Sequence, residues 1–396
     1  MKIIISGGGI GGLTAALCCL HHGHEVTVLE QAPDLGEVGA GLQISPNAMK
    51  VFEALGLAER LADAGFRPQG IEGRMGVSGM RLFSFALGDA AVKRWGSPYL
   101  HIHRADLIAV LQFALQVKAP DAVRLGAQVE GYVQDSNGVA AVLADGTEIV
   151  GDVLIGADGI HSPIREQMLG PDQPQFTGNV AWRAVVPVDR LGSDVPDSVA
   201  CAWMGRGQHA VTYLLRGGEL ANFVGVVERS DWTNESWTEE GSRAQALADF
   251  SGWHPTITRM IEASDEMFRW ALFDRAPLKT WTEGRVALLG DACHPMLPFM
   301  AQGAAMAIED AFVLAASLSK HDKIIPALES YQSTRLARAS KVQAGSRANA
   351  QTFHQRTPLG RLSTYGPMWL AGRIAPGMIQ ARQNWIYGHD VTLVGD

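Results

Sequence analysis

The sequence predicts an α/β protein in which a parallel nucleotide-binding fold is interrupted by an antiparallel β-sheet and followed by a helical C-terminal segment. Three observations predict this. The chain opens with a strand, a glycine cluster, an apolar helix and a second strand. Short β-type runs separated by turns fill about residues 180–228. An α/β pattern returns after Gly284, and residues from about 326 look helical.

The opening segment is a βαβ unit of the parallel-sheet type. Residues 2–6 form an apolar strand, and residues 13–20 form an apolar stretch with Gly23 as the expected helix stop. Residues 25–30 then read as the second strand. Between the first strand and the helix lies the pattern G-x-G-x-x-G, with glycines at 7, 9 and 12.

These three glycines have separate physical roles. Gly7 permits a tight turn, Gly9 lets the backbone approach a pyrophosphate, and Gly12 allows close packing of helix on strand. The helix N-terminus offers free N–H groups to the phosphates. Glu30, at the end of the second strand, can accept hydrogen bonds from ribose hydroxyls. This element suits FAD and NAD equally and disfavours only a 2′-phosphate.

The β-rich region is expected to be a separate antiparallel sheet. Its runs are short and are divided by Gly-rich or Pro-containing turns, which is typical of hairpin connections. The runs are residues 180–186, 198–204, 209–215 and 220–227.

Two later motifs place an aspartate in a small-residue turn at the end of an apolar strand. Residues 156–165 contain Asp158, and residues 290–295 contain Asp291. Ligands bind at the carboxyl ends of strands in such sheets. Together with the glycine fingerprint, these motifs indicate a flavin site rather than a plain NAD site.

On these three motifs the sequence resembles the single-component (group A) FAD-dependent aromatic hydroxylases. The branch of salicylate hydroxylase, 3-hydroxybenzoate 6-hydroxylase and 6-hydroxynicotinate 3-monooxygenase is the most similar, and the likeness extends through residues 385–390. The resemblance implies a Rossmann-like FAD-binding fold, a substrate domain built on the antiparallel sheet, and NADH or NADPH as a transient reductant. It also implies that dioxygen is delivered through a C4a-hydroperoxyflavin to a hydroxybenzoate- or hydroxypyridine-like ring.

The resemblance also implies roles for individual residues. Glu30 would bind the adenosine ribose, and Asp291 would bind the ribityl chain of the flavin. Asp158 would lie near the pyrophosphate and near the path of the transient nicotinamide. Arg104 would contact FAD and Gln43 would lie beside the flavin, although a surface arginine and an unliganded strand residue are the alternatives. The complete expected FAD set is Gly7, Gly9, Gly11, Gly12, Glu30, Gln31, Gln43, Arg104, Asp158, Asp291, Gly303 and Ala304.

Gly303 and Ala304 would open a long helix at the pyrimidine end of the flavin. Reduced flavin carries negative charge there, and a helix N-terminus stabilises such charge by ~0.3–1 kcal/mol. His294, inside the second aspartate motif, is expected to be structural rather than a base.

The catalytic candidates are His209, Tyr213 and Gln302. The two-residue period of a strand puts His209, Val211 and Tyr213 on one face. A neutral imidazole can take the proton of a substrate phenol, whose anion is the better oxygen acceptor. A histidine facing solvent is the alternative reading. Gln302 resembles a polar substrate contact in the 3-hydroxybenzoate branch.

Composition limits the other possibilities. The chain has 396 residues and a net charge of −8 from 33 basic and 41 acidic residues, which disfavours a nucleic-acid partner. We expect no secretion signal or membrane span, and therefore a cytoplasmic location. We also expect a monomer or a homodimer. The four cysteines (18, 19, 201 and 293) lack metal-type spacing, so no metal site is expected.

Some alternatives stay open. A flavoprotein epoxidase or a monooxygenase of a larger polycyclic or isoprenoid substrate would share all three motifs, and a non-catalytic redox-sensing flavoprotein is the rival from another class. Residues 36–41 are glycine-rich but no helix–strand–acid pattern follows, so no second nucleotide domain is expected. The expected domains are FAD-binding at 1–75, 101–175 and 276–325, substrate sheet at 76–100 and 176–275, and C-terminal helices at 326–396.

Overall fold

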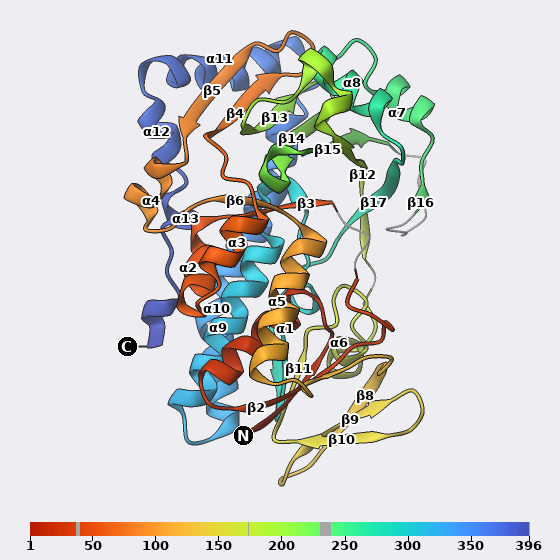
Figure 1. Cartoon of the computed structure of the whole chain (residues 1–396), viewed down its shortest axis with the longest axis vertical. Coiled ribbons are helices and arrows are strands. Elements are labelled where there is room, and N and C mark those ends of the chain that lie inside the picture. The colour runs from red at the N-terminus through yellow and green to blue at the C-terminus, as the bar shows by residue number, and fades with distance from the viewer. Residues whose placement is uncertain (37–39, 173, 230–238, 396) are drawn as a thin grey trace.

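The computed structural model describes residues 1–36, 40–172, 174–229 and 239–395 (Figure 1). Part of the glycine-rich segment 36–41 therefore lies outside the described residues. Two β-structures dominate the fold. A parallel sheet with its helices forms the lower half of the view in Figure 1, and a large mixed sheet forms the upper half.

The parallel sheet is the core of the nucleotide-binding fold. All of its pairs are parallel except that of the edge strand β18, which runs antiparallel to β19. Its central strands are nearly continuous apolar runs, as expected for a sheet that is covered on both faces. In sheet order they are β18 (Thr282–Glu283), β19 (Val286–Leu288), β11 (Val153–Gly156), β1 (Lys2–Ser6), β2 (Glu25–Leu29) and β7 (Val123–Arg124).

Helix α1 (Ile10–His21) lies at the centre of the helical layer. It packs against α5 (Arg104–Lys118) and α9 (Gly303–Lys320), and α10 (Ile324–Phe353) packs on the outside of α9. Gly23 follows the end of α1 with φ +78°, a left-handed conformation that favours glycine. The predicted βαβ opening and its helix stop are confirmed.

The upper sheet has eight strands and forms the wall of the site. The four runs that the sequence predicts correspond to β12, β13, β14 and β15. In sheet order the strands are β16 (Glu239–Glu240), β17 (Phe268–Asp274), β12 (Gln175–Pro187), β15 (Leu220–Glu228), β14 (Gln208–Leu215), β13 (Val199–Met204), β4 (Gly70–Met75) and β5 (Arg81–Ala86).

This sheet differs from the expectation in two respects. It is not wholly antiparallel, because β13 and β4 pair in parallel. Parallel neighbours need a long connection, and here the chain between β4 and β13 passes through the nucleotide-binding half. The sheet also begins at Gly70, before the expected domain limit at residue 75.

Two smaller β-structures were not predicted. An antiparallel meander of β8 (Val129–Gln134), β9 (Val139–Leu143) and β10 (Glu148–Gly151) lies at the lower end of the molecule in Figure 1. A ribbon of β3 (Gly41–Ile44) and β6 (Leu100–His103) lies between the two halves. It carries Gln43 and leads directly into Arg104 at the start of α5.

The remaining helices cover the edges and outer faces. Helices α7 (Arg243–Asp249) and α8 (Pro255–Ala263) cover the upper sheet, and α11 (Pro358–Ile374) and α12 (Pro376–Ala381) pack on β5. No described helix is both long enough and apolar enough to span a bilayer. The other helices are α2 (Pro46–Ala54), α3 (Ala58–Ala64), α4 (Asp89–Trp95), α6 (Pro163–Leu169) and α13 (Asn384–Tyr387).

Candidate active site

A single cavity of about 1440 Å³ connects the two halves of the molecule. Gly9 and Glu30 line one end, at the carboxyl edge of the parallel sheet, and His209 and Tyr213 on β14 line the other. Of the twelve residues expected to bind FAD, all but Gly12 line this cavity. The fold therefore brings together segments that are distant in sequence.

The glycine turn has the shape of a phosphate cradle. Gly7 has φ +107°, and a Cβ on Gly7 or Gly12 would collide with the backbone of Ala157 or Gly7, respectively. A Cβ on Gly9 would meet no described atom within 4 Å, because Gly9 borders the cavity. The first and third glycines are thus required by the fold itself, whereas the second leaves open the space that a pyrophosphate needs.

The Glu30 carboxylate is held in position by backbone N–H groups of the glycine turn and of the residues that follow Glu30. Its carboxylate accepts hydrogen bonds from the N–H groups of Gly8 at 2.6 Å and Ala32 at 2.8 Å. Each carboxylate oxygen keeps a further lone pair for a hydroxyl donor. Gln31 follows it as an exposed residue of the cavity lining.

The two aspartates lie at the predicted strand ends. Burial raises the pKa of Asp158 to about 6, and its Oδ1 has no hydrogen-bond partner among the described residues. Asp291 is accessible from the cavity yet surrounded by protein, and this burial raises its pKa, against the opposing effects of His294 and Arg104. An unpartnered polar atom in Asp158 and an accessible carboxylate in Asp291 fit a ligand that brings hydroxyl or other hydrogen-bond donors.

The end of the cavity between the halves matches the expected flavin position. The first turn of α9, at Gly303 and Ala304, opens onto it, and so does Gln43, whose side-chain oxygen accepts a 2.7 Å bond from the hydroxyl of Tyr99. Burial lowers the pKa of Arg104, and Asp291 opposes this effect. The residues present therefore fit the FAD that the sequence predicts, and their individual places along the cofactor stay predictions.

The predicted base lies in the wall of the cavity. His209 is only 2% exposed, and burial together with His354 lowers its pKa well below the ordinary value, so its imidazole is neutral. The predicted face of His209, Val211 and Tyr213 is confirmed, since all three line the cavity. The hydroxyl of Tyr213 donates to the carbonyl oxygen of Gly41 at 2.6 Å, which directs it toward the β3 ribbon.

Gln302 is more buried than expected for a side chain that contacts the substrate. Its Nε2 donates to Ser45 Oγ at 2.9 Å, and its Oε1 accepts from Asn47 Nδ2 at 3.2 Å. The side chain lines the cavity but is 1% exposed. Both ends of its amide are engaged by the protein, and its contact with substrate stays a prediction.

Arg183 on β12 is a cavity residue that the sequence reasoning missed. Its guanidinium lies over the indole of Trp270, 4.2 Å from the ring centroid, and burial lowers its pKa to about 10, so it is still charged at neutral pH. Among the described residues no carboxylate pairs with it, and its Nε has no hydrogen-bond acceptor. The available signal was a charged residue in an apolar strand of a predicted binding sheet.

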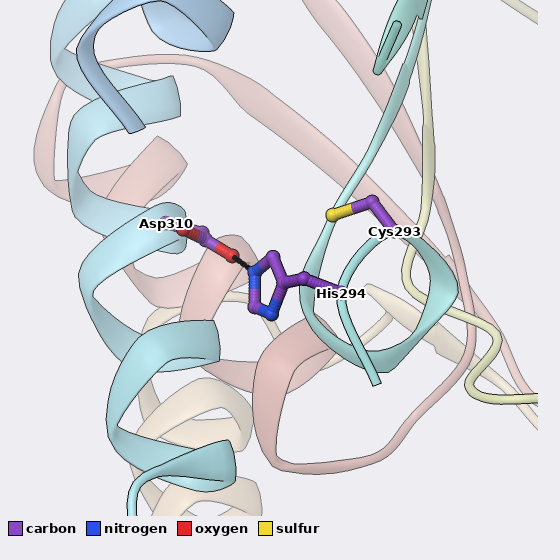
Figure 2. Close-up of side chains that lie close together, drawn as sticks. All are labelled: Cys293, His294 and Asp310. Carbon is purple, nitrogen blue, oxygen red and sulfur yellow. Dashed lines mark hydrogen bonds and ion pairs between the residues drawn. The ribbon is translucent and has the colours of Figure 1, made fainter. Parts of the chain in front are cut away.

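His294 is structural, as expected. Its Nε2 lies 2.5 Å from Asp310 Oδ2, an interaction that joins the turn after β19 to the middle of α9 (Figure 2). Burial acts to lower the pKa of His294, but Cys293 and Asp310 more than reverse this, so the imidazole is charged.

Cys293, His294 and Asp310 place three potential metal ligands within 4.8 Å of one another. Asp310 Oδ1, however, is already bonded to Arg335 at 2.7 Å. Two positive groups beside one carboxylate disfavour a cation, and the Cys293 thiol donates to the carbonyl oxygen of Gly290. We therefore assign the cluster a structural role.

The fold and the cavity define a flavoprotein oxidoreductase, with a dinucleotide cradle that opens onto a sheet-walled chamber. Comparison with known proteins is more specific. The model of the FAD binding domain family matches residues 1–346. 6-Hydroxynicotinate 3-monooxygenase of Pseudomonas fluorescens is 41% identical over 88% of this chain and 91% of that protein. 3-Hydroxybenzoate 6-hydroxylase 1 of Aquipseudomonas alcaligenes is 36% identical over 99% and 98%.

Among solved structures, Klebsiella pneumoniae HpxO complexed with FAD and uric acid has a TM-score of 0.85 and 29% identity, covering 96% of each chain. The chain belongs to the FAD binding domain family. It is an FAD-dependent aromatic-ring monooxygenase, which confirms the resemblance seen in the sequence.

Proposed function

We propose that this enzyme hydroxylates a small ring that carries a hydroxyl and an anionic group, as hydroxybenzoates and hydroxypyridine carboxylates do. NADH or NADPH is the reductant and dioxygen the oxidant. The observation that carries this proposal is one continuous cavity with the FAD cradle at one end and His209 and Arg183 at the other. Bound FAD supplies the redox and oxygen chemistry. The protein must bind the ring, orient it and take its proton.

His209 is the proposed proton acceptor. It is neutral, lines the cavity and lies on the same strand face as Tyr213. Removing the hydroxyl proton makes the ring a better electron donor, and such help is typically worth ~10²–10⁴-fold in rate. Tyr213 shapes the opposite side of the ring site.

Arg183 is the proposed partner of the anionic group. A net charge of −8 repels an anion at long range, so an anionic substrate needs a local cation. A buried charge without a counter-ion is costly, and a substrate carboxylate would remove that cost on binding. The same positive charge favours the phenolate form of the ring.

The test uses purified enzyme, its visible spectrum, and NADH or NADPH oxidation with salicylate, 3-hydroxybenzoate, 6-hydroxynicotinate and uncharged phenol. We expect non-covalently bound FAD, and hydroxylated product from at least one of the three acids. Turnover of polycyclic or isoprenoid compounds alone would contradict the substrate class, and a protein that binds no FAD would contradict the site.

A substitution of Arg183 tests whether this residue binds the substrate or the flavin. Arg183→Gln should raise KM for the carboxylated substrate at least tenfold, the equivalent of ~1.4 kcal/mol, and leave KM for phenol unchanged. An equal loss with both compounds would place Arg183 on the flavin instead of the substrate.

Because NAD(P)H and its oxidised forms circulate in the cytoplasm, we propose that the enzyme acts there. We propose also that it is a monomer or a homodimer.

A further inference from the structure

A chain of hydrogen bonds leads from the cavity wall to the protein surface. Nδ1 of His209 lies 2.6 Å from Nε2 of His354, the residue that ends α10. Nδ1 of His354 lies 3.0 Å from Oε1 of Glu228, the last residue of β15. His354 is 5% exposed, whereas the Glu228 side chain is 23% exposed. Three side chains from three elements thus connect a buried chamber with solvent.

The chain fixes which ring nitrogen carries each proton. A carboxylate only accepts, so His354 donates to Glu228 through Nδ1–H. Nε2 of a neutral His354 is then an acceptor, and His209 donates to it through Nδ1–H. Neutral His209 keeps a lone pair on Nε2, the nitrogen that is left for the cavity. The carboxylate at the surface therefore sets the buried histidine in the tautomer that a base requires.

We propose that His209, His354 and Glu228 form a proton relay that removes the hydroxyl proton of the aromatic substrate to solvent. The substrate O–H bond breaks and an N–H bond forms at Nε2 of His209. The Nδ1 proton of His209 passes to Nε2 of His354, the Nδ1 proton of His354 passes to Glu228, and Glu228 releases it to water. Each histidine begins and ends neutral, and the substrate becomes a phenolate.

The same path in reverse restores the starting tautomers. The product leaves as a neutral phenol after its oxygen takes the proton from Nε2 of His209. At the same time Nδ1 of His209 takes back the proton on Nε2 of His354, and Nδ1 of His354 takes a proton from solvent through Glu228, so neither ring becomes an anion. His354 and Glu228 act through His209 and do not touch the substrate.

The relay explains how a buried histidine can serve as a base. Burial lowers the pKa of His354 to about 4, and burial together with His354 lowers the pKa of His209 well below its ordinary value, so neither ring holds an extra proton at neutral pH. A stepwise hand-over to a surface carboxylate avoids a lasting positive charge on either histidine. Besides His354, the rings that pack on His209 from other elements are apolar, with those of Phe299 and Phe353 each 5.1 Å from its centroid.

The charged surroundings of the relay are few. Arg356 pairs with Glu228 on the solvent side. Tyr213, two residues beyond Val211 on the same strand face, is the other titratable group of β14 in the chamber, and burial raises its pKa. The cations of the cavity lining are Arg104, Arg183 and Arg382. Of these groups in the described chain, only Glu228 offers a proton acceptor that reaches solvent.

This inference rests on the proposed function, and the experiment separates the two. The holoenzyme is compared with His209→Gln, His354→Gln and Glu228→Gln, using whichever of 3-hydroxybenzoate, salicylate or 6-hydroxynicotinate the wild type hydroxylates. Glutamine at 354 can keep both hydrogen bonds but cannot pass a proton readily. His321→Gln is the matched control, because His321 also ends a long helix, α9, with its Nδ1 3.0 Å from the carbonyl oxygen of Ser317.

The measurements are FAD content, the rate of flavin reduction with substrate bound, and product formed per NAD(P)H oxidised from pH 6 to 10. We expect all variants to keep FAD and flavin reduction. At neutral pH the three relay variants should lose product by ~10²-fold, the usual size of lost general-base help, and release hydrogen peroxide instead. Their coupling should recover as pH rises toward the ~10 at which a phenol ionises unaided. Glu228→Asp should restore part of the neutral-pH coupling.

Each other outcome is decisive. If His209→Gln still forms as much product per NAD(P)H oxidised as the wild type, His209 is not the base and the relay is overturned. If His209→Gln is uncoupled while His354→Gln and Glu228→Gln behave like the wild type, the base stands and the relay is overturned. A loss in His354→Gln that does not recover with pH, or that His321→Gln shares, would mean a structural role and would also overturn the relay.

Discussion

The hydroxyl of Tyr213 donates a 2.6 Å hydrogen bond to the carbonyl oxygen of Gly41, and so joins the substrate sheet to the ribbon beside the flavin site. The contact is close on both sides, because a Cβ on Gly41 would lie 2.5 Å from Cε2 of Tyr213. The phenol group of Tyr213 therefore fixes the distance between the two halves of the chamber.

Tyr213→Phe should accordingly act on stability more than on proton transfer. The Gly41 carbonyl would lose its partner, at a cost of about 1–3 kcal/mol. Product formed per NAD(P)H should fall only a few-fold at neutral pH, with no recovery at high pH. Urea unfolding and coupling measurements check this. A pH-dependent loss like that of His209→Gln would make Tyr213 the base.

Gly9→Val should abolish FAD binding and leave the apoprotein folded. The Val side chain meets open space in the protein but fills the cradle of the pyrophosphate. Loss of the glycine at the helix N-terminus should lower apoprotein stability by at most about 1 kcal/mol. Fluorescence titration with FAD and urea unfolding measure the two effects.

Two glycine variants serve as comparisons. Gly12→Ala should destabilise the apoprotein itself, because its Cβ collides with the Gly7 carbonyl oxygen. Gly377→Ala in α12, where a Cβ meets nothing within 4 Å, should bind FAD normally. Normal FAD content in a well-folded Gly9→Val variant would mean that the cradle is elsewhere.

Asp158→Asn should stabilise the apoprotein in a pH-dependent way. The folded pKa of about 6 lies above the unfolded value of ~3.9, so the folded state alone holds a proton between these values. Stability therefore falls as pH rises from about 4 to 6, and the full penalty persists above 6. Because the side chain is partly accessible from the cavity, we expect a gain of about 1–2 kcal/mol at pH 8 and almost none at pH 4.

Urea unfolding of the apoprotein at both pH values measures this effect. Asp135→Asn provides a comparison of opposite sign. Backbone hydrogen bonds from Asn137 and Gly138 lower the pKa of Asp135, so its substitution should reduce stability at pH 8. A loss of stability in Asp158→Asn at pH 8 would contradict burial as the cause of its raised pKa.

Arg335→Met should strongly destabilise the enzyme. Arg335 is fully buried and pairs with both Glu309 and Asp310, so its removal leaves two carboxylates with less compensation in the core. The expected loss is about 3–5 kcal/mol. Arg190→Met, which breaks the exposed pair with Asp265, should cost less than about 1 kcal/mol. Equal losses in the two variants would show that Arg335 owes its effect to something other than buried charge.

The sequence alone determined the features that depend on near neighbours. The turn at Gly7, the close packing at Gly12 and the carboxylate of Glu30 all belong to one βαβ segment, so their spacing predicts their geometry. The two-residue period of a strand likewise predicted that His209 and Tyr213 would share a face. Such patterns are local, and the chain has little freedom to avoid them.

Only the tertiary structure decided the contacts between distant segments. His209 and His354 are 145 residues apart, and Gln302 and Ser45 are 257 apart, so neither contact has a local signal. The parallel pairing of β4 with β13 and the stacking of Arg183 on Trp270 depend in the same way on how strands distant in sequence assemble within the upper sheet. The glycine turn and Glu30 belong to one continuous segment of the sequence. The side chains of the substrate chamber, such as His209 and its partner His354, become neighbours only when distant segments pack together.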